Sequence, residues 1–170
     1  KFNNDFEVND FFKIPEPLIQ KKFSRIMSLK DGLKKMSKSE PSDLSRINMT
    51  DEKDQIINKI KKAKTDPLPM PSSIGELDKR PEAKNLIGIY SSLTGATLEK
   101  SINEFSGKNF SDFKDILSQV VVDKIIPISI EIKKLLQDKK HLDQILLEGV
   151  EKADNIASQK IKKIHEIVGF

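Results

Sequence analysis

Apolar residues recur at helical spacing through most of the second half of this 170-residue chain. Four amphipathic segments follow one another there, each with its own capping or terminating residue. The first begins at Pro81 and ends at Gly95, the second is capped by Thr97, the third spans residues 111–137, and the last follows Asp138. Helices of this kind bury their apolar stripes against one another. The pattern predicts an antiparallel α-helical bundle as the C-terminal domain.

The two longest of these helices carry the widest apolar stripes. In the helix over residues 111–137, Pro127 lacks an amide hydrogen, so a kink is expected near Asp123. Both stripes are expected to face the core. They comprise Phe113, Ile116, Leu117, Val120, Val121, Ile125, Ile128, Ile132 and Leu135 in this helix, and Leu142, Ile145, Leu146, Ala153, Ile156, Ala157, Ile161, Ile164 and Val168 in the last one.

The first half of the chain is less regular. Residues 51–64 predict one helix, with an apolar stripe and with Thr50 as its N-cap. Residues 66–79 contain three prolines and a glycine, so an irregular loop is expected there.

Residues 23–29 alternate in a way that predicts a β-strand. One isolated strand cannot form a sheet, so residues 1–45 are interpreted as the end of another domain and residues 46–170 as the helical domain. The chain opens on Lys1 with no signal-peptide character, and the simplest interpretation is that it starts partway through a larger protein.

Composition narrows the class of protein further. The absence of cysteine excludes a disulfide scaffold and thiolate metal sites. The longest apolar run, residues 120–132, is interrupted by charges and a proline and is too short to span a membrane. The net charge of +4 permits a nucleic-acid partner without requiring one. We expect a cytoplasmic protein with no membrane segment and no protein-bound metal.

A short segment rich in lysine and serine carries the chemistry. Residues 34–39 read Lys-Lys-Met-Ser-Lys-Ser, and they lie between Gly32 and Pro41. Ammonium groups and hydroxyls this close together suit a polyphosphate, whose charge they can bind as it develops. Gly32 is expected to act as a hinge that lets the loop close over a nucleotide. From composition alone, a solvated basic loop without a ligand is the alternative.

The order of these residues favours the first interpretation. Residues 35–39 spell KMSKS, the signature of class I aminoacyl-tRNA synthetases. The surrounding runs RIMSL at residues 25–29, RPEAKNLIGIYSSLTG at 80–95 and LLEGVEKADNIAS at 146–158 resemble the tryptophanyl-tRNA synthetases in particular. The resemblance covers essentially the whole chain in order. It implies the C-terminal half of such an enzyme, mainly α, in which the last piece of a Rossmann-type nucleotide-binding domain precedes a helical domain.

The resemblance also implies a reaction and its site. Tryptophan and ATP would form tryptophanyl-adenylate, and the acyl group would then pass to tRNA(Trp), with Mg²⁺ accompanying ATP and with the enzyme a homodimer. Lys35 and Lys38 would act in catalysis by stabilising the charge that moves onto the departing pyrophosphate. Ser37 and Ser39 would line the same phosphate site. Met36 and Ile26 would lie against adenine through their backbones. The ATP-binding residues implied in this way are Ile26, Lys35, Met36, Ser37, Lys38 and Ser39.

Part of the family's active site is not found in this sequence. No HIGH-type motif occurs, and the residues that hold tryptophan would lie upstream of Lys1. The isolated chain is therefore expected not to form the adenylate. His141 and His165 lie in amphipathic helices without a nucleophile pattern and are interpreted as structural.

The sequence does not decide the role of three lysine clusters. Residues 59–64, 133–140 and 160–163 can contact the tRNA backbone or simply form the solvated faces of helices. Two alternative functions also remain. One is another class I synthetase such as the tyrosine enzyme, and the other is a non-catalytic helical module that binds tRNA.

Overall fold

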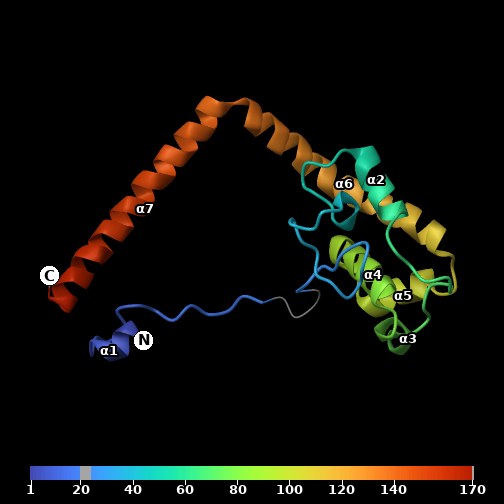
Figure 1. Cartoon of the computed structure of the whole chain (residues 1–170), viewed down its shortest axis with the longest axis horizontal. Coiled ribbons are helices and arrows are strands. Elements are labelled where there is room, and N and C mark those ends of the chain that lie inside the picture. Colours follow the sequence, from blue (N-terminus) through green and yellow to red (C-terminus); the bar gives the residue numbers. More distant parts are fainter. Residues whose placement is uncertain (20–23, 170) are drawn as a thin grey trace. The chain divides into compact units, whose positions relative to one another are not determined.

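The computed structural model describes residues 1–19 and 24–169, and α-helices dominate it, which confirms the mainly α prediction (Figure 1). In chain order, its elements are α1 (Phe2–Asp5), the 3-10 turn η1 (Asp43–Ser45), α2 (Lys53–Lys61), α3 (Ile74–Asp78), α4 (Pro81–Thr94), α5 (Leu98–Phe105), α6 (Phe110–Gln137) and α7 (Lys139–Val168). The chain divides into two compact units. One is Gln20–Lys133, and the other combines Lys1–Ile19 with Lys134–Phe170. The proposed boundary between functional domains near residue 45 stays a prediction.

Several predicted helix ends are confirmed. Pro81 opens α4, and Gly95 ends it in the left-handed conformation, with φ of 72°. The Thr97 side chain accepts a hydrogen bond from the Lys100 amide at 3.2 Å and so caps α5. Asp138 caps α7 in the same way. Local side-chain chemistry thus determines where these helices begin and end.

Helix α2 begins three residues after its predicted N-cap, Thr50. The N-cap is Glu52, which forms a reciprocal capping box with Gln55. Asp51 therefore lies outside the helix, where its carboxylate binds other residues. The predicted loop over residues 66–79 also differs, because Ser73 caps the short helix α3 within it.

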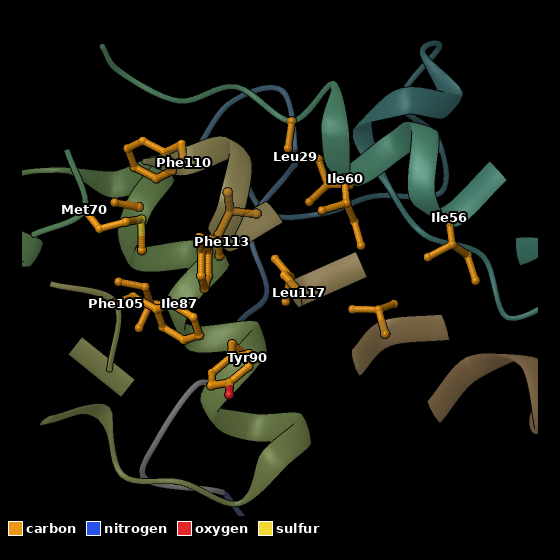
Figure 2. Packing of buried hydrophobic residues seen from close by; sticks show 14 of the residues in the cluster. Leu29, Ile56, Ile60, Met70, Ile87, Tyr90, Phe105, Phe110, Phe113 and Leu117 are labelled. Atoms are coloured by element: carbon orange, nitrogen blue, oxygen red, sulfur yellow. The ribbon is translucent and has the colours of Figure 1, made fainter. Parts of the chain in front are cut away.

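The larger unit has one hydrophobic core, to which α2, α4, α5 and the first part of α6 contribute (Figure 2). The Phe105 and Phe113 rings meet edge to face with centroids 4.8 Å apart, and Tyr90 meets Phe105 in the same geometry at 4.9 Å. The hydroxyl of Tyr90 donates to Glu104 at 3.1 Å, so its polar end is satisfied. The core is therefore a specific aromatic packing that fixes α4 and α5 against α6.

The stripes of the two longest helices are buried only in part. In α6 the core includes Phe113, Leu117, Val121 and Ile125, whereas Ile128 is 46% exposed. No described residue of α7 is buried, which contradicts the expectation that its stripe faces a core. An amphipathic helix is buried only where an opposing apolar surface covers it. The other segment of the same unit, residues 1–19, has only the one-turn helix α1, so it provides no long helix to cover α7.

None of the helices in residues 1–19 and 24–169 combines the length and the apolar character that a membrane span needs.

In the smaller unit, Lys160 of α7 contacts the N-terminal segment. The ammonium group of Lys160 donates to the Phe11 carbonyl and lies 3.9 Å from the centroid of the Phe11 ring. Phe12 meets the Phe11 ring edge to face. This contact attaches the first residues of the chain to the last helix.

Arg80 holds the proline-rich loop in place. Its Nε and Nη2 atoms donate to the two carboxylate oxygens of Asp66 at 2.8 and 2.5 Å. The same guanidinium donates to the carbonyls of Leu68 at 3.2 Å and Pro69 at 2.7 Å. The side chain of Arg80, at the start of α4, thus makes four hydrogen bonds to the first residues of this loop.

We expect acid to weaken this attachment. Burial raises the pKa of Asp66, but the Arg80 guanidinium and the Leu68 amide outweigh burial and hold the pKa below its ordinary value of 3.8. Because the folded-state pKa is depressed, the stabilisation is present above 3.8 and is lost as the pH falls through the folded-state value. The substitution Asp66→Asn should lower the thermal midpoint at neutral pH, and this difference from the wild type should shrink in acid. Thermal denaturation over a pH series tests this, and a difference independent of pH would contradict it.

Candidate functional site

The segment before the KMSKS residues forms a tight turn instead of the predicted strand. Phe23 lies outside the described residues, and over residues 24–29 the pairing is one isolated antiparallel bridge, between Met27 and Lys35. The Met36 amide donates to the Ile26 carbonyl at 2.9 Å, beside this bridge. A strand in a sheet needs a continuous partner strand, and among the described residues this segment has a single bridge. We call residues 26–36 the signature hairpin.

The six residues predicted to bind ATP all lie on or directly after the signature hairpin. The backbone hydrogen bond between Ile26 and Met36 brings the two predicted adenine-contacting residues together. Lys35 and Lys38 are exposed, so their ammonium groups are accessible to a ligand. The hydroxyls of Ser37 and Ser39 lie 2.9 Å apart and share a hydrogen bond. The two cations and two hydroxyls are thus presented on one short loop, and their role in binding ATP stays a prediction.

Gly32 lies at the tip of the signature hairpin, buried against the N-terminus of α4. A Cβ atom there would lie 2.6 Å from the backbone nitrogen of Glu82 and 2.6 Å from the carbonyl carbon of Pro81. No side chain fits at this distance, so glycine is required by close approach. Close packing against the Pro81–Glu82 peptide group therefore explains this glycine, and the expected hinge at Gly32 stays a prediction.

Asn85 of α4 pairs with the signature hairpin as a neighbouring strand would. Its Oδ1 atom accepts from the Met27 amide at 2.9 Å, and its Nδ2 atom donates to the Met27 carbonyl at 2.8 Å. Asn85 is buried, so these bonds satisfy polar groups that are shielded from water. A helix side chain thus replaces the missing sheet partner at Met27.

The base of the loop that follows Leu29 is closed by backbone hydrogen bonds. The Leu29 amide donates to the Ser45 carbonyl at 2.9 Å, and the Leu29 carbonyl accepts from the Lys64 amide at 2.7 Å. Leu29 itself is buried in the core. The KMSKS residues therefore belong to a loop whose two ends are attached to each other and to the end of α2.

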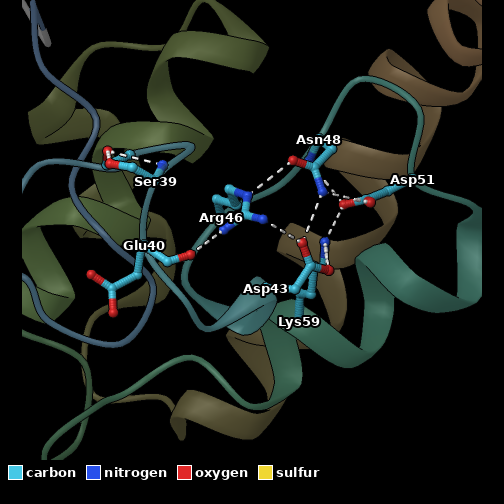
Figure 3. A network of polar contacts seen from close by, with 8 residues as sticks. Ser39, Glu40, Asp43, Arg46, Asn48, Asp51 and Lys59 are labelled. Carbon is cyan, nitrogen blue, oxygen red and sulfur yellow. Dashed lines mark hydrogen bonds and ion pairs between the residues drawn. The ribbon is translucent and has the colours of Figure 1, made fainter.

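We call residues 30–40, which contain the KMSKS sequence, the signature loop. A network of charged and polar side chains begins directly after it (Figure 3). We name it the α2 polar cluster; its members are Asp43, Arg46, Asn48, Asp51 and Lys59. The Lys59 side chain is only 3% exposed, and its ammonium group lies 2.6 Å from an Asp51 oxygen and 2.7 Å from an Asp43 oxygen. The pKa of the Asp43 carboxyl is held below its ordinary value mainly by the hydrogen bond from Lys59 and next by the hydrogen bond from Asn48. The charged side chains of the cluster are therefore paired with one another.

Sequence reasoning missed this cluster and placed Lys59 in a lysine-rich stretch, residues 59–64, that was expected either to contact tRNA or to form a solvated helix face. The structure instead buries Lys59 within the apolar stripe of α2. A signal was present, because Lys59 lies at the helical spacing shared by Ile56, Ile60 and Ala63. A lysine at a stripe position must find carboxylate partners, since an unpaired buried charge is too costly.

A second lysine of the larger unit, Lys114 of α6, is buried with its ammonium group at the end of α2. The Lys114 ammonium group donates to the carbonyls of Ala63 at 2.6 Å and Lys61 at 3.2 Å. Burial lowers the pKa of Lys114. This side chain satisfies terminal carbonyls of α2 and attaches the helix to α6.

A pocket of about 530 Å³ opens between the signature hairpin and α4, with Met27, Gly32, Pro81 and Asn85 among its lining residues. The six predicted ATP-binding residues are not among those that line it. Over residues 1–19 and 24–169, no three carboxylate or imidazole side chains gather in a way that would hold a metal ion. His141 and His165 both lie on the exposed surface of α7. The signature loop is thus the part of the described chain with the clearest chemical character.

Solved structures of similar fold are tryptophanyl-tRNA synthetases. The enzyme from Mycoplasma pneumoniae matches 99% of this chain and 49% of its own length, with a TM-score of 0.79 and 23% identity. The Campylobacter jejuni enzyme, complexed with ADP and tryptophan, matches with a TM-score of 0.67 and 23% identity, over 99% of this chain and 50% of its own length. These similarities establish the fold.

Sequence comparison establishes the family. The family described as "tRNA synthetases class I (W and Y)" matches residues 1–125. Tryptophan–tRNA ligase of Caulobacter vibrioides is 46% identical over 170 residues, which are 100% of this chain and 49% of the relative. The ligase of Agrobacterium fabrum is 48% identical over 166 residues, 98% of this chain and 47% of the relative. The chain spans about half the length of these curated relatives. It belongs to the class I tRNA synthetases of the tryptophan and tyrosine group, and the resemblance to the tryptophan enzymes is confirmed.

Proposed function

We propose that the full-length protein containing this chain is a tryptophan–tRNA ligase and that the chain supplies its signature loop. The observation that carries the proposal is the KMSKS sequence at residues 35–39, presented on a loop whose base is fixed to the helical unit. The curated relatives, which are named tryptophan–tRNA ligase, support tryptophan as the amino acid.

In the proposed first step, a carboxylate oxygen of tryptophan attacks the α-phosphorus of ATP. The bond between this phosphorus and the bridging oxygen breaks, and the electron pair leaves with pyrophosphate. The negative charge that gathers on the leaving group is stabilised by the ammonium groups of Lys35 and Lys38, while the hydroxyls of Ser37 and Ser39 donate to phosphate oxygens. Mg²⁺ enters with ATP as part of the substrate and supplies further positive charge.

Adenine is proposed to lie against the backbone of the signature hairpin at Ile26 and Met36. The hydrogen bond between these residues fixes one edge of this surface without using a side chain. In the second step, the acyl group passes from the adenylate to the 3′ end of tRNA(Trp). The exposed lysines of residues 133–140, together with Lys162 and Lys163, are candidates for contact with the tRNA backbone. We further propose that the enzyme is a cytoplasmic homodimer.

The tyrosine enzyme is the second candidate, because the family that matches includes both specificities. Tryptophan-dependent exchange of radioactive pyrophosphate into ATP by the full-length protein tests the proposal, with tyrosine as the matched substrate. We expect exchange with tryptophan and not with tyrosine. The isolated 170-residue chain should show no exchange. Exchange with tyrosine alone, or with neither amino acid, would overturn the proposal.

A further inference from the structure

The signature loop ends at Glu40, and the backbone carbonyl of this residue is held by a partly buried cation, Arg46. The Nη1 atom of Arg46 donates to the Glu40 carbonyl at 2.8 Å. The Arg46 side chain is only 18% exposed, although it serves an exposed loop. This contact fixes the chain two residues after Lys38, a span of at most about 7 Å.

Arg46 is itself held in one orientation. Its Nε atom donates to Asn48 at 3.2 Å, and its Nη2 atom lies 3.1 Å from a carboxylate oxygen of Asp43. The 3-10 turn Asp43–Ser45 places Asp43 and Arg46 three residues apart, so this ion pair spans a single turn. All three guanidinium nitrogens therefore have a partner: Nη1 binds the loop, and Nε and Nη2 bind members of the α2 polar cluster.

The α2 polar cluster connects this fork to the core. Asn48 donates to both Asp43 and Asp51, at 3.1 Å each, and Lys59 links the same two carboxylates. Because Lys59 lies in the apolar stripe of α2 and is nearly inaccessible to water, the cluster cannot shift without moving that helix. A continuous path of charged hydrogen bonds thus runs from the core of the larger unit to the end of the KMSKS loop.

We propose that Arg46 is a positioning residue for adenylate formation, which rests on the function proposed above. It fixes the Glu40 carbonyl and thereby places Lys38 where the charge of the departing pyrophosphate develops. Arg46 does not touch the nucleotide. Its effect is on geometry, and small displacements of a charged group from the reacting atoms are costly in rate.

The substitution Arg46→Lys tests this in the full-length protein, because lysine keeps the charge but cannot bind the carbonyl, Asn48 and Asp43 together. We expect kcat for tryptophan-dependent pyrophosphate exchange to fall about 10- to 100-fold, with little change in KM for tryptophan. Without ligands, trypsin should cleave after Lys34, Lys35 or Lys38 faster than in the wild type, because the loop opens more often.

Arg80→Lys is the matched control. Arg80 also binds a carboxylate and loop carbonyls, but it does so in the proline-rich loop. The Arg80→Lys substitution should lower the thermal midpoint without changing kcat or tryptic cleavage after Lys34, Lys35 and Lys38. Equal effects of both substitutions on cleavage and kcat would show a loss of global stability and would overturn the proposal.

The remaining outcomes are also decisive. If Arg46→Lys leaves either cleavage or kcat at the wild-type level, Arg46 does not position the loop for catalysis. If the wild type shows no exchange with tryptophan, the proposed function fails, and the positioning role in adenylation fails with it. Cleavage in the absence of ligands then still reports whether Arg46 holds the loop, so the two failures are distinguishable.

Discussion

Replacing Lys38 with alanine in the full-length protein is expected to lower kcat for tryptophanyl-adenylate formation by about 100-fold or more, with little change in KM for tryptophan. The ammonium group of Lys38 is exposed, and the structure gives it a fixed attachment two residues later, at Glu40. A cation placed in this way interacts most strongly when charge moves onto the leaving pyrophosphate. An interaction that strengthens only in the transition state appears in kcat and leaves substrate binding nearly unchanged.

Lys30→Ala is the control for this prediction. Lys30 lies in the same loop and is also exposed, but it is outside the five signature residues. Removing its charge should change kcat little, because a loss of general positive charge is screened by salt. Pyrophosphate exchange at saturating tryptophan and ATP gives kcat for both variants. A wild-type kcat for Lys38→Ala, or equal losses for Lys38→Ala and Lys30→Ala, would remove Lys38 from the mechanism.

The parts of the fold that depend on neighbouring residues in the chain could be predicted from the sequence. Pro81, Thr97 and Asp138 act as expected at their helix starts, because each cap needs only the next few residues. The apolar periodicity of α6 likewise predicted the buried positions Phe113 and Leu117. Information of this kind is local, and the sequence displays it directly.

Features that depend on distant residues could not be predicted. The expected strand has one bridge, to Lys35, and at Met27 the backbone groups pair with Asn85, a helix residue 58 positions away. The burial of Lys59 was not predicted, because its carboxylate partners Asp43 and Asp51 precede the helix. Pairings of this kind depend on the tertiary fold, which overrides the local pattern.

The candidate site divides in the same way. The chemical character of residues 34–39 is visible in the sequence, because lysine and serine side chains there are close together along the chain. The attachments that hold those residues come from η1, α2 and α4, through the signature hairpin and the α2 polar cluster. The sequence thus shows which groups are chemically suited to a polyphosphate, whereas the fold determines where they are held.

Gly32→Ala is expected to destabilise the protein by about 3 kcal/mol, near the upper end of what overpacking usually costs. The added Cβ atom would lie 2.6 Å from two backbone atoms of Pro81 and Glu82, which are held by α4 and cannot rotate away as a side chain would. The signature hairpin must then move away from α4, which would weaken the hydrogen bonds between Asn85 and Met27. We expect kcat for pyrophosphate exchange to fall as well, because the same movement displaces Lys35 and Lys38.

Gly75→Ala separates this steric effect from the general effect of replacing glycine. Gly75 lies in the helix α3 of the same unit, and a Cβ atom there would meet nothing within 4 Å. Alanine at that position should stabilise the protein by about 0.5 kcal/mol, since it restricts the unfolded chain. Thermal and urea denaturation of the two variants should therefore move in opposite directions. If Gly32→Ala were as stable as the wild type, the signature hairpin would be free to separate from α4, and a hinge at Gly32 would again be the better explanation for its glycine.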